Sequence, residues 1–256
     1  MLSARWLMLR ELVKRDLQSR YAGSLLGFFW SFLQPVWQLV LYSFVFGSVM
    51  KVSLVGEQAP KFSLFLFAGL LPWLAFSEGV TRSATSVTDQ AHLVKKLRFP
   101  SELLVATCVL TALVHEAIAT ALFTAILATM GALSWQSLPW LLLAVPLQVA
   151  LTLGLGLFLA SAHVFLRDIS QVLGMLFGAW FYITPIVYPL AYVPERFQTL
   201  IAANPLTALV HLYRRAFFGG HGMIPGVLTL AICAAATLVA GWLVFRRLRP
   251  AFVDFI

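Results

Sequence analysis

The sequence predicts an all-α polytopic membrane protein with six transmembrane helices. Of its 256 residues 61% are hydrophobic and 11% are charged, which leaves too little polar surface to cover a globule in water. Six apolar stretches approach or exceed the roughly 20 residues that a helix needs to cross a bilayer. None of these stretches alternates between polar and apolar residues with the period of two that is typical of membrane β-strands.

A basic amphipathic helix is predicted for residues 1–20, ahead of the first apolar stretch. Its narrow apolar face carries Leu2, Trp6, Leu9, Val13 and Leu17, and the opposite face carries Arg10, Glu11, Lys14, Arg15 and Gln18. Such a helix lies on a membrane surface with its basic side toward anionic headgroups. A secretory signal peptide would instead begin its apolar core soon after a short charged start.

The predicted transmembrane helices cover residues 28–50, 62–80, 103–131, 139–163, 172–190 and 224–245. If both termini are cytoplasmic, the inner segments hold 13 of the 18 Lys and Arg residues and the outer segments hold 5. The positive-inside rule therefore predicts cytoplasmic termini, and an even number of spans agrees.

Two connections are long enough to form structure of their own. The inner one predicts a short helix over residues 86–97, which has a Ser/Thr/Asp start and stops before Pro100. It is either a solvated loop or a docking helix for a cytoplasmic partner. The outer connection, residues 191–223, is apolar and rich in helix breakers but too short for two full spans. Half-inserted helices fit it, because irregular backbone at membrane depth is tolerated beside protein or a wet cavity.

Several kinds of chemistry are not predicted. No P-loop motif surrounds any lysine, so ATP must be handled by another chain. His115 and Glu116 begin a zincin motif, but Ala119 stands where the second histidine is needed. Cys108 and Cys233 lie in apolar runs without metal-ligand spacing. We therefore expect no catalytic residue, no metal site and no bound cofactor in this chain, and the net charge of +8 reflects membrane topology rather than nucleic-acid binding.

Ionisable residues at membrane depth are few, namely Glu78, His115 and Glu116. Such residues usually face a bundle interior or a cavity, because a charge in lipid costs several kcal/mol. They form either a proton relay or interhelical hydrogen bonds. His115 and Glu116 point about 100° apart on a helix, so only one of them is expected to line a given path.

Aromatic residues make up 14% of the chain. Most fit interfacial belts or core packing, but Trp and Tyr also hold sugar rings through an apolar face and a polar edge. Two Gly-x-x-x-Gly patterns, at Gly23 and Gly27 and at Gly174 and Gly178, permit close helix packing.

Six motifs in order resemble the permease subunit of the ABC-2 polysaccharide exporters, a family that includes O-antigen, capsule and teichoic acid exporters. They are RYAGSLLGFFWSFLQP (20–35), FAGLLPWLAFSE (67–78), VKKLRFPSELL (94–104), FLRDISQVL (165–173), ITPIVYPLAYVPERF (183–197) and NPLTALVHLYR (204–214). The resemblance covers nearly the whole chain.

The resemblance implies a homodimer of six-span subunits that encloses a channel, with two copies of a cytoplasmic ABC ATPase that bind ATP and Mg. It implies that residues 86–97 are a coupling helix for the ATPase, that residues 1–20 flank the entrance for a lipid-linked glycan, and that residues 192–219 form half-inserted helices near the exit. The expected coupling residues are Asp89, Gln90, His92, Leu93 and Lys95.

The expected function is ATP-driven export of an undecaprenyl-diphosphate-linked polysaccharide across the bacterial inner membrane. O-antigen is the first expectation for this polysaccharide. Arg15 and Arg20 are expected to attract the lipid diphosphate. The polymer is expected to meet Trp30, Trp73, Phe76, Tyr182 and Tyr188.

Three alternatives remain open. The same machine would serve capsular polysaccharide or teichoic acid. An ion-coupled secondary transporter would use Glu78 or Glu116, although the chain has no internal repeat of the kind common in that class. A membrane-embedded glycan enzyme would need an acid and base pair on one face, and no such pair is evident.

Overall fold

The computed structural model describes residues 2–20, 22–24, 27–51, 61–96, 99–220, 222 and 224–256, and every regular element among them is helical. The α-helices are α1 (Leu2–Arg20), α2 (Trp30–Tyr42), α3 (Phe62–Asp89), α4 (Ala91–Lys96), α5 (Glu102–Thr129), α6 (Leu141–Phe165), α7 (Ile169–Ile183), α8 (Glu195–Ala202), α9 (Pro205–Phe218), α10 (Val227–Leu248) and α11 (Phe252–Phe255). Shorter helical turns are η1 (Gly27–Phe29), the π-helical η2 (Ser43–Val49), η3 (Trp135–Trp140), η4 (Leu190–Tyr192) and η5 (Arg249–Ala251). The prediction of an all-α polytopic protein is confirmed.

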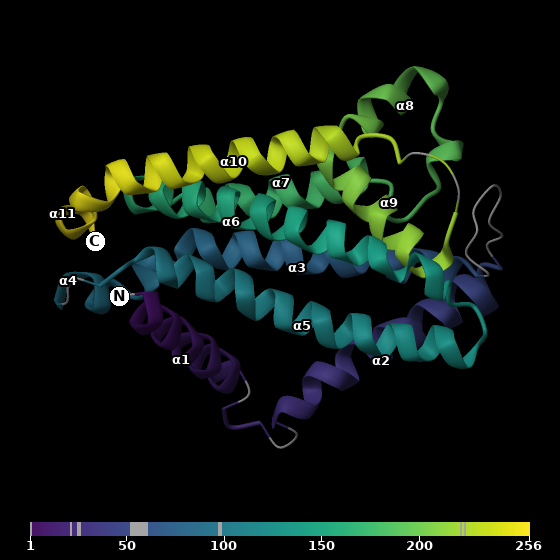
Figure 1. Cartoon of the computed structure of the whole chain (residues 1–256), viewed down its shortest axis with the longest axis horizontal. Helices are drawn as coiled ribbons and strands as arrows, with labels where there is room; N and C mark the ends of the chain where they lie inside the picture. The colour runs from purple at the N-terminus through teal and green to yellow at the C-terminus, as the bar shows by residue number, and fades with distance from the viewer. Residues whose placement is uncertain are drawn as a thin grey trace.

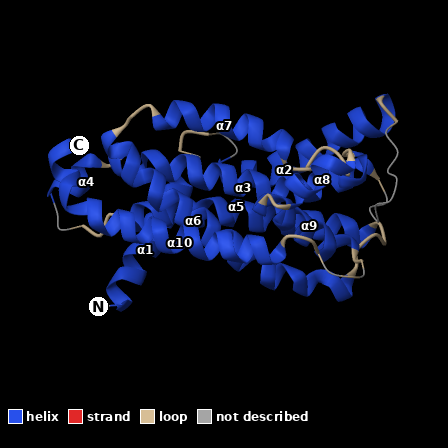
Figure 2. Cartoon of the chain, turned by 90° about the horizontal axis from the view of Figure 1, so that it is seen from above, coloured by secondary structure: helices blue, strands red, loops and turns tan. Residues whose placement is uncertain are grey.

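The long helices α3, α5, α6 and α10 run side by side along the molecule (Figure 1). Both termini, α4 and α11 lie at one end of this bundle, and α8 lies at the other. Seen from above, α7 follows one long side of the bundle (Figure 2). Met1 and Leu97, the outermost residues of two predicted helices, lie outside the described residues.

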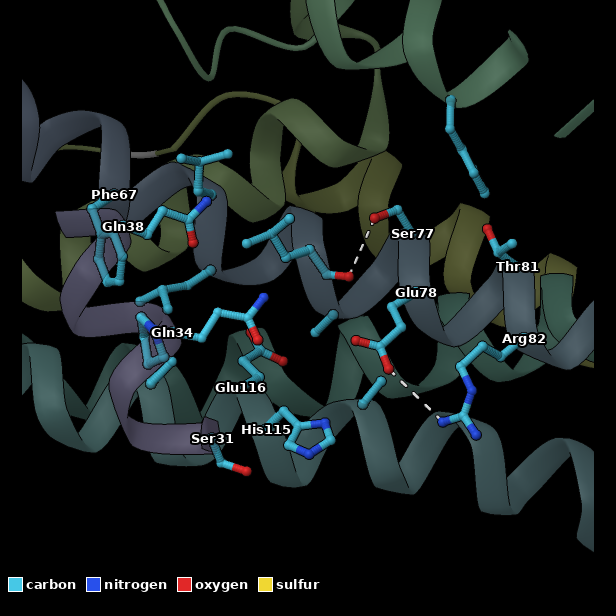
Figure 3. Close-up of a pocket in the computed structure, with 18 of the residues that line it drawn as sticks. Ser31, Gln34, Gln38, Phe67, Ser77, Glu78, Thr81, Arg82, His115 and Glu116 are labelled. Atoms are coloured by element: carbon cyan, nitrogen blue, oxygen red, sulfur yellow. Dashed lines mark hydrogen bonds and ion pairs between the residues drawn. The ribbon is translucent and has the colours of Figure 1, made fainter. Parts of the chain in front are cut away.

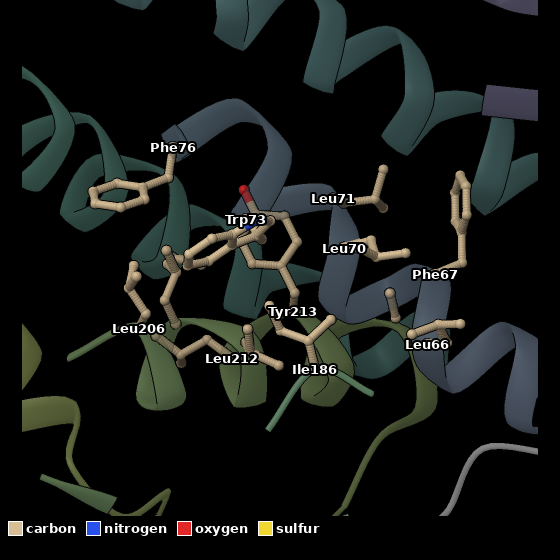
Figure 4. Close-up of a cluster of buried hydrophobic side chains, with 14 of the residues drawn as sticks. Leu66, Phe67, Leu70, Leu71, Trp73, Phe76, Ile186, Leu206, Leu212 and Tyr213 are labelled. Atoms are coloured by element: carbon tan, nitrogen blue, oxygen red, sulfur yellow. The ribbon is translucent and has the colours of Figure 1, made fainter. Parts of the chain in front are cut away.

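Helix α3 is the centre of the bundle. It is apolar on all sides over its first half, which is the pattern of a fully buried helix, and it packs against α5, α6 and α9. Figure 4 shows its side chains from Leu66 to Phe76 meeting Ile186 and the α9 residues Leu206, Leu212 and Tyr213. The core therefore joins the first half of the chain to α9, far away in sequence.

Helices α6 and α10 approach closely because each presents a glycine to the other. A Cβ atom on Gly241 would overlap the backbone carbonyl of Gly154. By contrast, a Cβ on Gly174 or Gly178 would meet nothing within 4 Å. No described residue of the subunit therefore packs closely at that Gly-x-x-x-Gly pattern.

Within the part of the chain that the structure describes, five helices are long and apolar enough to cross a membrane: Trp30–Val49, Phe62–Asp89, Glu102–Thr129, Trp135–Phe165 and Val227–Phe255. The predicted span over residues 172–190 differs, because α7 ends at Ile183 after 15 residues. At 1.5 Å per residue this is about 22 Å, against roughly 30 Å of hydrocarbon. The reason lies at Thr184, which precedes Pro185 and is extended (ψ 130°), since proline disfavours the α conformation in the residue before it.

The inner connection also differs from the predicted helix over residues 86–97. Ser86 and Val87 belong to α3, which continues to Asp89. Gln90 is not helical, and α4 begins at Ala91. Tertiary packing explains the longer α3, because Val87 is fully buried in a small cluster with Val105 and Leu157. The Ser/Thr/Asp segment, which resembles a helix start, therefore lies inside α3, because burial of Val87 lengthens that helix.

The outer connection forms two helices, α8 and α9. Pro205 is the first residue of α9, and the side chain of Asn204 caps the helix by accepting a hydrogen bond from the amide of Leu206 at 3.1 Å. Arg214 on α9 is 5% exposed and donates to the carbonyls of Pro185 and Ile186, each at 2.8 Å. Helix α9 is therefore bonded to the turn that follows α7.

Helix α1 packs along α5. Leu9, Val13 and Leu17 on its predicted apolar face are half-buried, whereas Trp6 on the same face is 64% exposed. Arg15 lies on the exposed side. The predicted face thus contacts the protein over its second half and leaves a large aromatic side chain uncovered near its start.

Candidate functional site

A cavity of about 500 Å³, lined by both apolar and polar side chains, lies between α2, α3, α5 and α7, beside the last residue of α1 (Figure 3). Its floor is apolar, with Phe67, Leu70 and Leu71 of α3 and Phe177 of α7. Its polar residues are Arg20, Ser31, Gln34, Gln38, Ser77, Glu78, Thr81, Arg82, His115 and Glu116. This is a dense set of polar side chains for the interior of a membrane protein, where such groups mark substrate or ion pathways.

The cavity is open between α2 and α7. Gln34 on α2, Leu74 on α3 and Gly174 on α7 all line it, and all three are exposed. A ligand can therefore enter sideways, from the direction in which these residues are uncovered.

An ion-pair network joins α1 to the cavity wall. Arg20 forms a close ion pair with Glu78, and its guanidinium lies 2.9 Å from Nδ1 of His115. Because a guanidinium has no acceptor, Nδ1 must accept this bond, which places the proton of the neutral ring on Nε2. Arg82 donates to Asp16 of α1 at 2.6 Å.

The same network shapes the charge state of Asp16. Burial raises the pKa of its carboxyl, but the hydrogen bond and the positive charge of Arg82 act in the opposite direction and outweigh burial. The pKa of Asp16 therefore lies below its ordinary value of 3.8, and the ion pair is intact at neutral pH.

Three buried polar atoms of the cavity residues have no hydrogen-bond partner among the described residues, namely Nη1 of Arg82, Oε1 of Glu78 and Oε1 of Glu116. Oε1 of Glu78 is held by its ion pair with Arg20 and lies 3.8 Å from Nη1 of Arg82. Buried polar atoms are rarely left without partners, so Nη1 of Arg82 and Oε1 of Glu116 indicate where a bound polar group would be held.

A buried hydrogen-bond chain continues from Glu116 to α9. Gln148 of α6 donates to Oε2 of Glu116 at 2.7 Å, and the Tyr213 hydroxyl donates to Oε1 of Gln148 at 2.8 Å. Gln148 and Tyr213 are 0% and 1% exposed. The interhelical bonds foreseen for His115 and Glu116 are thus present, but both residues line one cavity, so the prediction that only one would do so is wrong.

The five aromatic residues predicted for the glycan path differ in exposure, from buried through half-buried, as Tyr188 is, to exposed. Trp73 and Phe76 are buried in the subunit, where Trp73 packs on Phe177 and Phe181. Trp30 and Tyr182 expose 44% and 68% of their surface. The Tyr188 hydroxyl donates to the carbonyl of Tyr182 at 2.7 Å. A role along the path stays a prediction for all five.

The predicted coupling residues lie at the end of the bundle that carries both termini (Figure 1). Asp89 ends α3 and accepts a hydrogen bond from Thr85 at 2.6 Å, and Gln90 lies at the break between α3 and α4. His92 and Lys95 are exposed on α4, and Leu93 is half-buried. This segment offers polar side chains at one end of the molecule.

Of the two arginines predicted near the entrance, only Arg20 reaches the cavity. Sequence reasoning missed Arg82, Gln34 and Gln38. The spacing of Glu78 and Arg82, one helical turn apart, was the available signal for a shared site. The pairing of Arg20 with Glu78 was not predictable, because the two residues lie on separate helices.

Among the described residues, no group of three His, Cys, Asp or Glu side chains could hold a metal ion. The cavity instead offers guanidinium, amide and carboxyl groups to a polar ligand. Polar and ionisable side chains enclosed by membrane-spanning helices are typical of substrate or ion pathways.

Comparison with known proteins gives the family. Residues 8–218 match the family model described as ABC-2 type transporter, and the chain belongs to this family. The chain is 31% identical to the O-antigen export system permease protein RfbA of Myxococcus xanthus, over 97% of this chain and 95% of the relative. It is 29% identical to the RfbA protein of Klebsiella pneumoniae over the same shares. It is 25% identical to the polysialic acid transport protein KpsM of Escherichia coli, over 93% of this chain and 92% of the relative.

Proposed function

We propose that this chain is the membrane permease subunit of an ATP-driven exporter that moves a lipid-linked O-antigen polysaccharide across the bacterial inner membrane. The observation that carries the proposal is full-length similarity to permeases named for O-antigen export, at 29–31% identity over 97% of the chain. The capsule permease matches less closely, at 25% identity over 93% of the chain.

ATP hydrolysis is assigned to a separate ABC ATPase, two copies of which bind ATP and Mg. The docking surface proposed for it is the segment from Asp89 to Lys95, at the end of the bundle that holds both termini. Arg246, Arg247 and Arg249 lie in the same region, at the end of α10 and in η5. A concentration of basic residues at one end supports a cytoplasmic location for that end and for both termini.

A homodimer is proposed because the cavity is open on one side. Gln34 and the charged pair of Arg20 and Glu78 would otherwise border lipid, where polar and ionisable groups are costly. A second copy facing α2 and α7 would turn the open side into part of an enclosed path. The exposed rings of Trp30 and Tyr182 would then be available to a sugar chain.

At the opposite end of the bundle, α8 and α9 are proposed to form the half-inserted region near the exit. Helix α9 is buried against α3 and α10, whereas α8 is largely exposed. An α-helix of 8 residues such as α8 is about 12 Å long and is too short to cross a bilayer.

Ion-coupled transport has less support. Glu78 is paired with Arg20, and Glu116 accepts a hydrogen bond from Gln148, so both carboxylates have partners within the subunit. A direct test is transport after the ATPase subunit has been inactivated at its P-loop lysine. ATP-driven export requires that transport stops.

The decisive experiment is deletion of the gene in its own host, followed by analysis of glycans on the inner face of the cytoplasmic membrane. We expect long undecaprenyl-linked O-antigen to accumulate while surface O-antigen is lost, and expression of the gene in trans restores the surface polymer. Trapping of a capsular polysaccharide or teichoic acid would reassign the cargo and keep the machine. A normal surface glycan without a trapped intermediate would refute the proposed function.

A further inference from the structure

The cavity holds two guanidinium groups that share one carboxylate. Arg20 comes from the end of α1 and Arg82 from α3, yet both approach Oε1 of Glu78. The side chains are partly exposed, at 27% for Arg20, 29% for Arg82 and 32% for Glu78. The three side chains therefore reach the cavity, while the facing atoms, Nη1 of Arg82 and Oε1 of Glu78, are themselves buried.

Arg82 is oriented by a second carboxylate. Its Nη2 is bonded to Asp16 at 2.6 Å, while its Nη1 lies 3.8 Å from Glu78 and makes no hydrogen bond among the described residues. Asp16 thus fixes the guanidinium, and Glu78 balances its charge without bonding Nη1 closely. A guanidinium held in this way can donate to an anion that approaches Nη1 more closely than Glu78 does.

We propose that Glu78 occupies an anion site in the ligand-free permease, and that the diphosphate of a lipid-linked ligand binds there by replacing the Glu78 carboxylate on Arg20 and Arg82. The inference deepens the proposed function and rests on it for the identity of the ligand. A diphosphate offers more oxygens than one carboxylate, so it bonds both guanidiniums at once, and arginine forks favour phosphate oxygens.

The size of the cavity and its open side suit such a ligand. Its volume of about 500 Å³ is within the range of roughly 300–1,000 Å³ typical of small-molecule pockets. The opening between α2 and α7 lets a lipid tail remain in the bilayer while its headgroup enters. Gln34, Gln38 and Glu116, with its unpartnered Oε1, lie on the α2 and α5 walls of the same cavity, where they can bond the hydroxyls of the first sugar (Figure 3).

Diphosphate binding should become stronger in one variant of the site, whereas a substitution that only damages the fold weakens binding. Glu78→Gln removes the competing charge and keeps the side-chain shape, so it strengthens diphosphate binding by about tenfold, which corresponds to one charge-assisted hydrogen bond. Arg20→Gln weakens binding by a similar factor. A variant that merely loosens the fold would weaken binding in both cases.

The test is native mass spectrometry of the full-length protein in detergent, titrated with undecaprenyl diphosphate and undecaprenyl monophosphate. Glu102→Gln is the matched control, because Glu102 pairs with Arg5 and Arg249 and does not line the cavity. We expect Glu78→Gln to strengthen binding of the diphosphate more than that of the monophosphate, and Glu102→Gln to change neither. Glu78→Asp, which shortens the side chain but retains its charge, should fall between wild type and Glu78→Gln, and it replaces Glu78→Gln if that variant does not fold.

Inorganic diphosphate distinguishes the two sources of the anion. If it competes with the lipid, and does so better in Glu78→Gln, the site recognises the diphosphate group itself. If neither inorganic diphosphate nor the charge at position 78 changes lipid binding, the isoprenoid chain is what the site recognises, and the proposal is overturned. Equal effects of Glu78→Gln and Glu102→Gln would also overturn it. Binding is measured without export, so an intact surface glycan after gene deletion would refute the proposed function and leave this result standing.

Discussion

Arg82 and Asp16 are 66 residues apart in sequence, and the Arg82 guanidinium donates to the Asp16 carboxylate at 2.6 Å. This ion pair ties the amphipathic helix α1 to the central helix α3. The adjacent pair of Arg20 and Glu78 makes a second tie between the same helices. Helix α1 is thus attached to α3 by these two ion pairs, to His115 of α5 by Arg20, and to the bundle by its half-buried apolar residues.

The first prediction concerns Asp16→Asn. Loss of the charge weakens the bond to Arg82 and destabilises the docking of α1 by about 1 kcal/mol, the usual size for a partly exposed ion pair. Site-directed crosslinking between α1 and α5 in membranes measures the docked fraction. Glu11→Gln on the exposed side of α1 is the control and should leave crosslinking unchanged. Equal crosslinking in wild type and Asp16→Asn would show that the ion pair of Asp16 and Arg82 does not hold α1.

The second prediction concerns pH. Because the pKa of Asp16 is below its ordinary value in the folded protein, its ion pair adds stability above that ordinary value and loses it as pH falls through the folded-state pKa. Docking of α1 should therefore be constant from neutral pH down to about pH 5 and decrease below about pH 4. The same crosslinking assay across this range provides the measurement, and Asp16→Asn should remove the part of the pH response that Asp16 causes. If crosslinking of Asp16→Asn decreased at low pH as much as crosslinking of the wild type, the pH response would belong to another titratable group.

The third prediction addresses the buried chain of Glu116, Gln148 and Tyr213. Glu116→Ala leaves the buried amide of Gln148 without its 2.7 Å acceptor, which costs about 1–3 kcal/mol, in addition to the cavity created. Glu116→Gln keeps an acceptor and the side-chain volume, so it should cost less than about 1 kcal/mol. Thermal unfolding in detergent ranks the two variants. If Glu116→Gln destabilised as much as Glu116→Ala, the charge rather than the hydrogen bond would be the stabilising feature.

The fourth prediction compares two glycines. Gly241→Ala places a methyl group against the Gly154 backbone and forces α6 and α10 apart, at a cost of more than about 2 kcal/mol for overpacking. Gly174→Ala is the control, since its new methyl group meets nothing within 4 Å. We expect a lower yield of folded protein and a lower unfolding temperature for Gly241→Ala only. Similar losses for both variants would contradict the close approach of α6 and α10.

Some elements of the site were predictable from residue types. Glu78, His115 and Glu116 stood out because ionisable residues are rare in apolar stretches, and all three line the cavity. The interhelical bond of Glu116 followed from the same reasoning. The partner could not be named, because a glutamine on α6 acquires its importance only when folding places it 2.7 Å from that carboxylate.

The predicted limits of individual elements were less accurate where tertiary packing competes with local signals. The Ser/Thr/Asp segment before Gln90 has the composition of a helix start, yet α3 runs through it because Val87 is buried beside Val105. At Thr184 the opposite occurred, since an apolar run continues in sequence while Pro185 ends the helix.

The all-α fold, the number of apolar segments and the amphipathic first helix depend on composition and periodicity, and a bilayer imposes these on any chain that must satisfy its own backbone hydrogen bonds in lipid. Those properties can be predicted from the order of residues along the chain. The cavity cannot, because Arg20, Glu78, Arg82 and His115 come from three helices and interact only through the angles at which α1 and α5 pack on α3. Charge pairing at a distance of a few ångströms depends on tertiary geometry, and only the folded structure determines which arginine faces which carboxylate.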